Sequence, residues 1–221
     1  ALGNTTLMER DSNGNPTKVT RPNGAVVTMT YDFRGNLLSS RDPVDGTTTF
    51  TYEPNFNLVT SIKDPNGKST AISYDLKGNP IEIIDALGDK TQMAYNSQGL
   101  LALVTSAAGT PQQNTTSFTY DARGNLFTTT DPKGNVTTLA YDSAGNVFRS
   151  TDSEGRVTEF TYDALNRLTS VRDFVGDVTT YAYDPKGNLA QVVDASGQNT
   201  SFAYDALDRL AQQRGDAEHG D

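Results

Sequence analysis

The sequence contains no cysteine, which excludes disulfide bonds and thiol chemistry. It contains no tryptophan and a single histidine, His219, close to the C-terminal end. Catalytic sites of the Cys–His and Ser–His kinds are therefore excluded from the body of the chain. Long apolar runs are also missing, so no transmembrane helix is expected, and the start lacks the charged-then-apolar pattern of a signal segment.

Positive charge is scarce, because 18 Lys and Arg stand against 27 Asp and Glu and give a net charge of −9. Binding to nucleic-acid phosphates needs a Lys/Arg surface, so we expect no nucleic-acid partner. The length of 221 residues suits one large domain or two ordinary ones. The first residue is Ala1 rather than Met, which indicates a piece of a longer or processed chain.

One seven-letter motif recurs along the whole chain. It reads "YDARGNL" at Tyr120, "YDSAGNV" at Tyr141 and "YDALNRL" at Tyr162. Most copies begin 21 residues after the previous one, and stepping back 21 residues from Tyr31 reaches Arg10, a copy that has lost its Tyr. The only large irregularity is an insertion, residues 110–113. A repeat of this regularity determines the fold. The Tyr residues that head a copy are Tyr31, Tyr52, Tyr74, Tyr95, Tyr120, Tyr141, Tyr162, Tyr183 and Tyr204.

Each copy contains two turn signals with the same spelling, Asp-x-x-Gly. The first follows the Tyr directly, and the second follows it by about half a repeat, as in "DPNG" at Asp64 and "DPKG" at Asp131. Asp accepts bonds from turn amides, Pro has a fixed φ, and Gly takes the position of positive φ. We expect positive φ at Gly35, Gly124, Gly145 and Gly187, and carboxylate–amide bonds within their own turns for Asp32, Asp121, Asp142, Asp163, Asp184 and Asp205.

The segments between the turns read as strands. A large apolar residue precedes each Tyr by two positions, as Phe118 precedes Tyr120, so the two side chains share one face of a strand. The segments are rich in Thr, Val and aromatic residues, and no window of useful length has helical periodicity. The sequence therefore predicts an all-β chain in which the Tyr side chains form a ladder, with equivalent atoms about 9 to 10 Å apart.

Two repeat architectures remain open for a unit of this length. A parallel β-helix has coils of similar size, but its corners bend the chain, whereas Asp-Pro-x-Gly signals reverse it. We therefore favour one continuous, coiled antiparallel β-sheet that gains one β-hairpin per repeat. We expect a single domain of about ten repeats over residues 1–213 and a disordered tail over residues 214–221.

No position has the features of a catalytic or metal site. Each carboxylate has near-equivalents in the other copies, so a role in turns explains it better than acid–base catalysis. "DSNGN" at Asp11 begins like a calcium loop, but Pro16 and Pro22 stand where that loop needs Gly and Glu. We expect no enzyme activity, metal or cofactor. The expected structural anchors are Tyr31, Asp32, Gly35, Tyr52, Tyr74, Asp75, Tyr95, Tyr120, Asp121, Gly124, Tyr141, Asp142, Gly145, Tyr162, Asp163, Tyr183, Asp184, Gly187, Tyr204 and Asp205.

The pattern "YDxxGNL…DPxG…YD", with "YDALNRL" and "YDALDRL", resembles the YD repeats of Rhs proteins, of the B and C components of insecticidal Tc toxins and of teneurins. The resemblance implies a sheet that spirals into a hollow shell, which in the toxin members encloses a toxic polypeptide. It implies a structural wall segment of such a shell or of a surface filament, in a secreted or cell-surface protein of bacterial origin.

A different function remains open, that of an extracellular carbohydrate-binding or adhesive module. The only break in the repeat that we identify is residues 106–116, which offers no aromatic or charged side chain to a glycan. "RGD" at Arg214 is a three-letter match that arises easily by chance. The expected partners are further repeats of the same chain or other copies at the C-terminal edge, an enclosed toxin polypeptide or, in the alternative function, glycans. The edge is singled out because the last copy, "YDALDRL", has not diverged as terminal repeats do.

Overall fold

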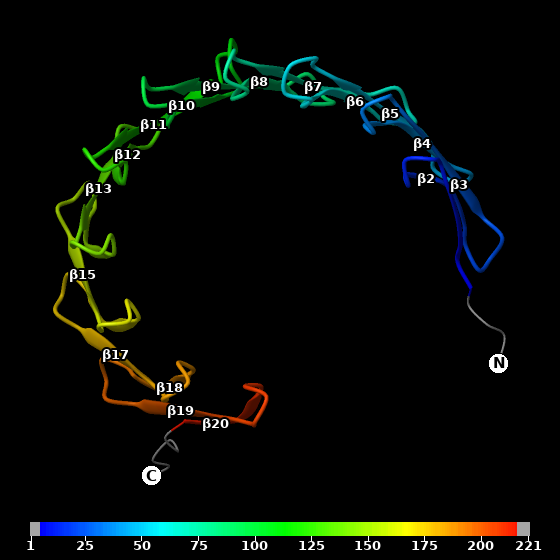
Figure 1. Cartoon of the computed structure of the whole chain (residues 1–221). Coiled ribbons are helices and arrows are strands. Elements are labelled where there is room, and N and C mark those ends of the chain that lie inside the picture. Colours follow the sequence, from blue (N-terminus) through cyan, green and yellow to red (C-terminus); the bar gives the residue numbers. More distant parts are fainter. Residues whose placement is uncertain (1–4, 216–221) are drawn as a thin grey trace. The chain divides into compact units, whose positions relative to one another are not determined.

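A computed structural model of the chain describes residues 5–215 (Figure 1). These residues form twenty β-strands of one sheet and no helix. The contacts divide the chain into two compact units, residues 1–115 and residues 116–221, directly behind the insertion. The first unit holds β1 (Leu7–Arg10), β2 (Pro16–Thr20), β3 (Val26–Tyr31), β4 (Leu37–Asp42), β5 (Gly46–Tyr52), β6 (Val59–Lys63), β7 (Ser69–Tyr74), β8 (Pro80–Ile84), β9 (Lys90–Tyr95) and β10 (Leu101–Ser106).

The second unit has the same construction, and its first strand begins just before the division. Its strands are β11 (Asn114–Tyr120), β12 (Leu126–Thr130), β13 (Val136–Tyr141), β14 (Val147–Thr151), β15 (Val157–Tyr162), β16 (Leu168–Arg172), β17 (Val178–Tyr183), β18 (Leu189–Val193), β19 (Asn199–Tyr204) and β20 (Leu210–Gly215).

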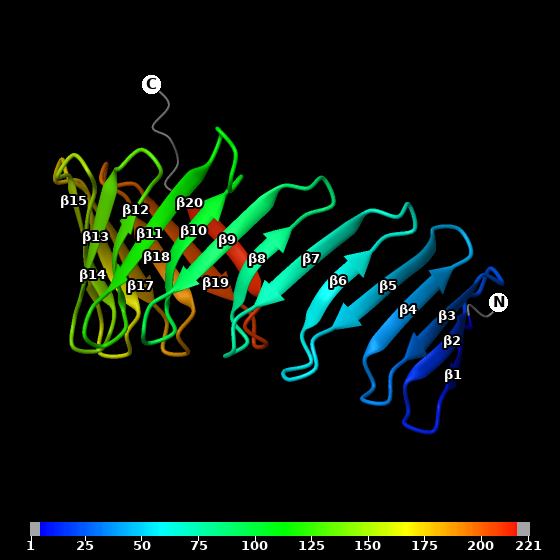
Figure 2. The ribbon, with the colours of Figure 1, turned by 90° about the horizontal axis from the view of Figure 1, so that it is seen from above.

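Within each unit every strand pairs antiparallel with the next strand of the chain (Figure 2). In β13 and β14, for example, Leu139 lies opposite Ser150, and in β14 and β15 Thr151 lies opposite Val157. The predicted antiparallel sheet with one hairpin per repeat is confirmed. The alternative, a parallel β-helix, is wrong, because successive strands reverse direction at each Asp-x-x-Gly turn.

Both turns of a repeat have one geometry. In the turn after Tyr141, the Gly145 amide donates to the Asp142 carbonyl over 3.2 Å, and the Asp142 amide donates to the Asn146 carbonyl over 2.9 Å. In the turn at the other end of the hairpin, the Gly134 amide donates to the Asp131 carbonyl over 3.0 Å, and the Asp131 amide donates to the Asn135 carbonyl over 2.9 Å. A type I turn followed by a residue of positive φ is a common three-residue connection between antiparallel strands.

The turn that follows the Tyr carries a β-bulge that the other turn lacks. Tyr141 lies opposite Val147 but Ala140 lies opposite Arg149, so Phe148 has no counterpart. The same shift of one residue follows the head position in all ten hairpins. A bulge bends its strand and increases the local twist. Each repeat therefore bends its hairpin at one end only.

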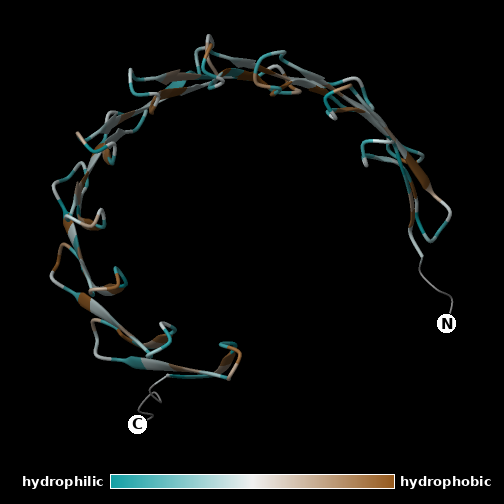
Figure 3. Cartoon of the chain, in the orientation of Figure 1, coloured by the Kyte–Doolittle hydropathy of each residue, from teal (hydrophilic) through white to brown (hydrophobic). Residues whose placement is uncertain are grey.

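The sheet is a single layer with two unlike faces. One face carries the head Tyr of each repeat, the apolar residue two positions before it, and the residues that lie opposite these two on the next strand. Phe160 lies opposite Val171, for example, and Tyr162 lies opposite Leu168. The other face carries mostly Thr, Ser and charged residues. Figure 3 shows hydrophobic colour within the strands and hydrophilic colour at most turns. Among the described residues the buried hydrophobic core consists of Ala108 alone, at 6% exposure.

The ends of the array differ in part from expectation. Arg10 takes the place of the Tyr in the first hairpin and lies opposite Pro16, so the diverged copy folds like the others. Arg214 and Gly215, which we expected at the start of the disordered tail, belong to β20. Residues 216–221, which include His219, lie outside the described residues. That residues 1–213 form a single domain stays a prediction.

Candidate functional site

The hydrogen bonds of the Asp carboxylate explain why Asp recurs at the first position of the turn. In the seventh copy Asp142 Oδ1 accepts the amides of Ala144 and Asn146, each over 2.9 Å. Asp142 Oδ2 accepts the Asn146 side-chain amide over 3.0 Å. The side-chain bond from Asn146 is the largest cause that lowers the pKa of Asp142, and the backbone bonds add to it. The carboxylate is therefore held charged within its own turn.

The same bonds recur in the other turns. The carboxylates of Asp32, Asp121, Asp163, Asp184 and Asp205 each accept two amides of their own turn over 2.8–3.0 Å. The φ angles of Gly35, Gly124, Gly145 and Gly187 are 88°, 85°, 91° and 97°. The expected carboxylate–amide bonds and positive φ angles are present, whereas the importance of these residues as anchors stays a prediction.

Two copies use a different set of residues for the same turn. In "YDALNRL" Asn166 takes the place of Gly at φ 59°, and in "YDALDRL" Asp208 does so at φ 58°. Arg then replaces the following Asn, and Arg167 Nε donates to Asp163 Oδ2 over 2.7 Å. Sequence reasoning missed this exchange of amide for guanidinium. The available signal was that Gly and the following Asn change together.

Eight of the head Tyr residues connect their repeat to the one before it. The Tyr141 hydroxyl donates to the Leu126 carbonyl over 2.8 Å, fifteen residues earlier. The corresponding bonds occur in the copies headed by Tyr31, Tyr52, Tyr74, Tyr95, Tyr162, Tyr183 and Tyr204. Tyr120, the remaining head residue, ends β11 opposite Leu126.

Sequence reasoning predicted a packing role for these Tyr residues and missed the hydrogen bond. Burial raises the pKa of Tyr141, and the negative charge of Asp121 raises it further. A signal was present, because the head position is Tyr in nine copies and never Phe, whereas Phe, Met, Ile, Leu and Tyr all occur two positions earlier. A strict choice of Tyr over Phe indicates that the hydroxyl is used.

One part of the polar face departs from the repeat. Arg149 on β14 lies opposite Glu159 on β15, which lies opposite Arg172 on β16. Glu159 stands three residues before a Tyr, where the other Tyr-headed copies have Thr, Ala, Gln or Ser. We missed this break, because the three charged residues are separated in sequence and only the strand register brings them together.

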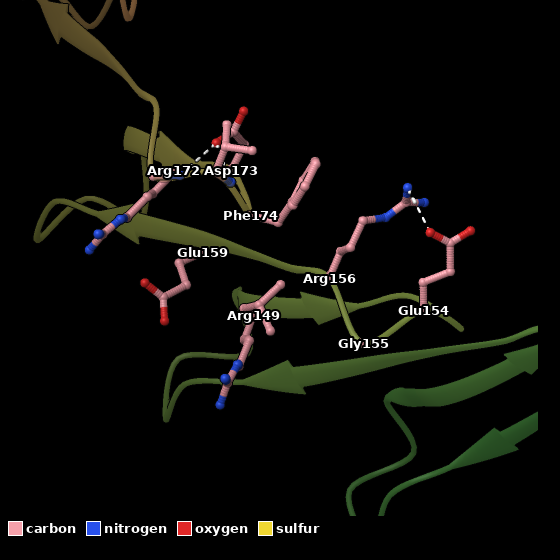
Figure 4. A pocket seen from close by; sticks show the side chains of 11 residues that line it. Arg149, Glu154, Gly155, Arg156, Glu159, Arg172, Asp173 and Phe174 are labelled. Atoms are coloured by element: carbon pink, nitrogen blue, oxygen red, sulfur yellow. Dashed lines mark hydrogen bonds and ion pairs between the residues drawn. The ribbon is translucent and has the colours of Figure 1, made fainter.

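The three residues line a cavity of about 540 Å³ together with Arg156 and Phe174 (Figure 4). The Arg156 guanidinium lies 5.4 Å from the centre of the Phe174 ring and forms ion pairs with Asp152 and Glu154. Arg149 and Arg172 form no ion pair within residues 5–215. The lining thus holds three Arg, of which Arg149 and Arg172 form no ion pair within residues 5–215, and one aromatic ring, Phe174. It also holds three carboxylates, those of Glu154, Glu159 and Asp173.

Within residues 5–215, no group of three or more His, Asp or Glu lies close enough together to hold a metal ion. No helix in that part of the chain could span a membrane. The motif carboxylates of Asp121, Asp142 and Asp163 accept hydrogen bonds within their own turns.

A sequence model described as the teneurin YD-shell matches residues 8–109 and 88–219. The chain belongs to the YD-shell family. Crystal structures of TcdB2-TccC3 and TcdB2-TccC3-TEV share the fold at 22% identity, with TM-scores of 0.78 and 0.76. The matches cover 97% and 96% of this chain but only 13% and 12% of those chains. None of the curated proteins matches the chain in sequence.

Proposed function

We propose that this YD-shell chain is a non-catalytic wall segment of a larger secreted or cell-surface protein, whose shell encloses or presents a toxic polypeptide. The observation that carries the proposal is the bond from the hydroxyl of eight head Tyr residues to the carbonyl fifteen residues earlier. In those eight copies the bond connects a repeat to its predecessor and has a structural role. The resemblance to the shell components of Tc toxins supports the enclosed polypeptide.

The single-layer construction also supports a wall. A globular domain of this length buries most of its large apolar side chains, but here the buried core of the described residues is Ala108. Successive hairpins stabilise one another through ladders and turn contacts, as in other repeat proteins. Such a sheet can be extended by adding hairpins, and extension is what a wall requires.

We propose that the wall continues at β20. This strand pairs with β19 along one edge, and all six of its residues are exposed. It contains no Pro. An unblunted edge strand presents amides and carbonyls that pair readily with another strand. Further repeats of the same chain or another copy would fit this edge.

The enclosing function can be tested on the full-length parent protein. Limited proteolysis should leave the enclosed polypeptide intact in the wild type. It should degrade that polypeptide faster when Asp142→Ala and Asp163→Ala loosen two neighbouring turns of the wall. Asp45→Ala is the control, because no hydrogen bond or ion pair of its carboxylate is seen within residues 5–215. Equal cleavage of the polypeptide in all three proteins would contradict enclosure.

A further inference from the structure

Neighbouring repeats of the second unit are paired over only part of their length. In the ladder between β12 and β13, Thr128 with Thr138 is the last pair on the side of the turns that follow the Tyr residues. Beyond this pair the Tyr141 hydroxyl spans the gap to the Leu126 carbonyl. We call each such gap, between the second strand of one repeat and the first strand of the next, a seam. The second unit has four seams, at β12–β13, β14–β15, β16–β17 and β18–β19.

Two of these seams are held by a further side-chain contact between the repeats on either side. Across the β14–β15 seam, Asn146 Nδ2 donates to Asn166 Oδ1 over 2.9 Å. Across the β16–β17 seam, the Arg167 guanidinium lies 4.5 Å from the centre of the Tyr183 ring. Each contact starts from the turn that follows a Tyr, so it closes the seam at its open end.

The β18–β19 seam is closed by Asp208. Its carboxylate accepts from Lys186 Nζ over 2.9 Å and from Asn188 Nδ2 over 3.2 Å. Asp208 and Asn166 both occupy the turn position of positive φ, where most other copies have Gly. A side chain at this φ has a conformational cost that Gly avoids. The bond to the preceding turn offsets that cost and explains the use of Asn and Asp there.

The β12–β13 seam lacks such a contact. Within residues 5–215, no hydrogen bond, ion pair or ring contact joins the turn of residues 121–125 to the turn of residues 142–146. Gly145 takes the position that Asn166 has in the next turn, and a methyl group there would meet no atom within 4 Å. A cavity of about 460 Å³ is lined by residues of both turns.

We propose that the β12–β13 seam is the weakest of the four and is where the sheet of the second unit opens first. The Tyr141 hydroxyl donates the one hydrogen bond seen across this seam in the described residues, whereas the next three seams have a second contact. Local opening occurs where few contacts must be broken. A wall would part at such a seam without unfolding its other repeats. The inference rests on contacts within the sheet and does not depend on the proposed wall function.

Hydrogen exchange followed by NMR on the whole chain tests the proposal. Opening a seam exposes the amides of its ladder. Protection factors in the β12–β13 ladder should therefore be about threefold to tenfold lower than in the β14–β15 ladder, the factor that one net hydrogen bond gives. Asn166→Gly should lower protection in the β14–β15 ladder by the same factor. Asn166→Asp should preserve it, because Asp208 accepts the equivalent bond from Asn188.

Gly145→Asn is the converse variant, and it keeps the test decisive if Asn166→Gly folds poorly. It places at the β12–β13 seam the side chain that Asn166 provides at the next seam, with Asn125 as its partner. Protection in the β12–β13 ladder should rise about threefold. Equal protection of the two ladders in the wild type, or unchanged protection in either folded variant, would overturn the proposal. An equal loss for Asn166→Asp and Asn166→Gly would overturn it as well.

Discussion

The phenol of Tyr162 donates a hydrogen bond to the carbonyl of Val147, the first residue of the preceding repeat's second strand, over 2.9 Å. Tyr162→Phe removes this bond and retains the ring. We expect the free energy of unfolding to fall by about 0.5–1.5 kcal/mol, the usual net value of one hydrogen bond. Chemical denaturation measures it.

The chain offers a matched control for that substitution. Tyr181 lies on the same face two residues before Tyr183, and no hydrogen bond of its hydroxyl is seen within residues 5–215. Tyr181→Phe should change stability by less than about 0.5 kcal/mol. Equal losses for the two variants would show that the ring, not the hydroxyl, stabilises the repeat.

The second prediction concerns the turn carboxylate. Asp142→Ala leaves the amides of Ala144 and Asn146 without their acceptor. We expect the midpoint of thermal unfolding to fall by roughly 2 to 4 °C, while Asp45→Ala leaves it unchanged. An unchanged midpoint for Asp142→Ala would remove this residue from the structural anchors.

The third prediction separates the cost of an unfavourable backbone conformation from the cost of a steric clash. A methyl group at Gly145 would meet no atom within 4 Å, but φ there is +91°. Gly145→Ala should cost about 1–2 kcal/mol, and Gly145→Asn less, since Asn tolerates this region and Asn166 occupies it naturally. Gly46→Ala should cost more than Gly145→Ala, because its methyl group would lie 2.8 Å from the Cβ of Pro65. Urea denaturation of the three variants ranks them. The reverse order would contradict this account.

The fourth prediction is a loss of stability at both ends of the pH scale. The folded pKa of Asp121, Asp142 and Asp163 lies below the ordinary 3.8, mainly because of side-chain bonds from Asn125, Asn146 and Arg167. Their contribution is complete above the unfolded pKa of 3.8 and is lost as the pH falls through the lowered folded values. Several turns titrate together, so unfolding below pH 4 should be steep.

At alkaline pH the tyrosines act in the opposite direction, because their contribution to stability is lost as the pH rises. Burial raises the folded pKa of Tyr141 and Tyr162 above the ordinary 10.0, and the charges of Asp121 and Asp142 raise it further. The neutral hydroxyls therefore stabilise the fold below pH 10, and this contribution is lost as the pH rises toward the folded pKa. Urea denaturation across the pH range, with tyrosinate absorbance alongside, tests both windows. A stability independent of pH below 4 would contradict the role of the carboxylates.

Short motifs in the sequence predict much of this fold. Asp-x-x-Gly specifies the reversals, and the alternation of Phe160 and Tyr162 specifies a strand with one apolar face. The bulge at Phe148 could not be predicted, because it depends on which residues lie opposite one another. That register also brings Arg149 opposite Glu159. The bond from Tyr162 to Val147 likewise needs two strands in place, and only the exclusive use of Tyr pointed to it.

The central claim, that the chain is one stretch of a continuing wall, is tested most directly by an experimental structure of the full-length parent protein. The account predicts a further antiparallel strand along the outer edge of β20. If the repeat continues, a Tyr hydroxyl fifteen residues beyond Leu210 should donate to the Leu210 carbonyl, as Tyr204 does to Leu189 over 3.0 Å. A solvent-exposed outer edge of β20, or a cap of a different fold there, would contradict the claim.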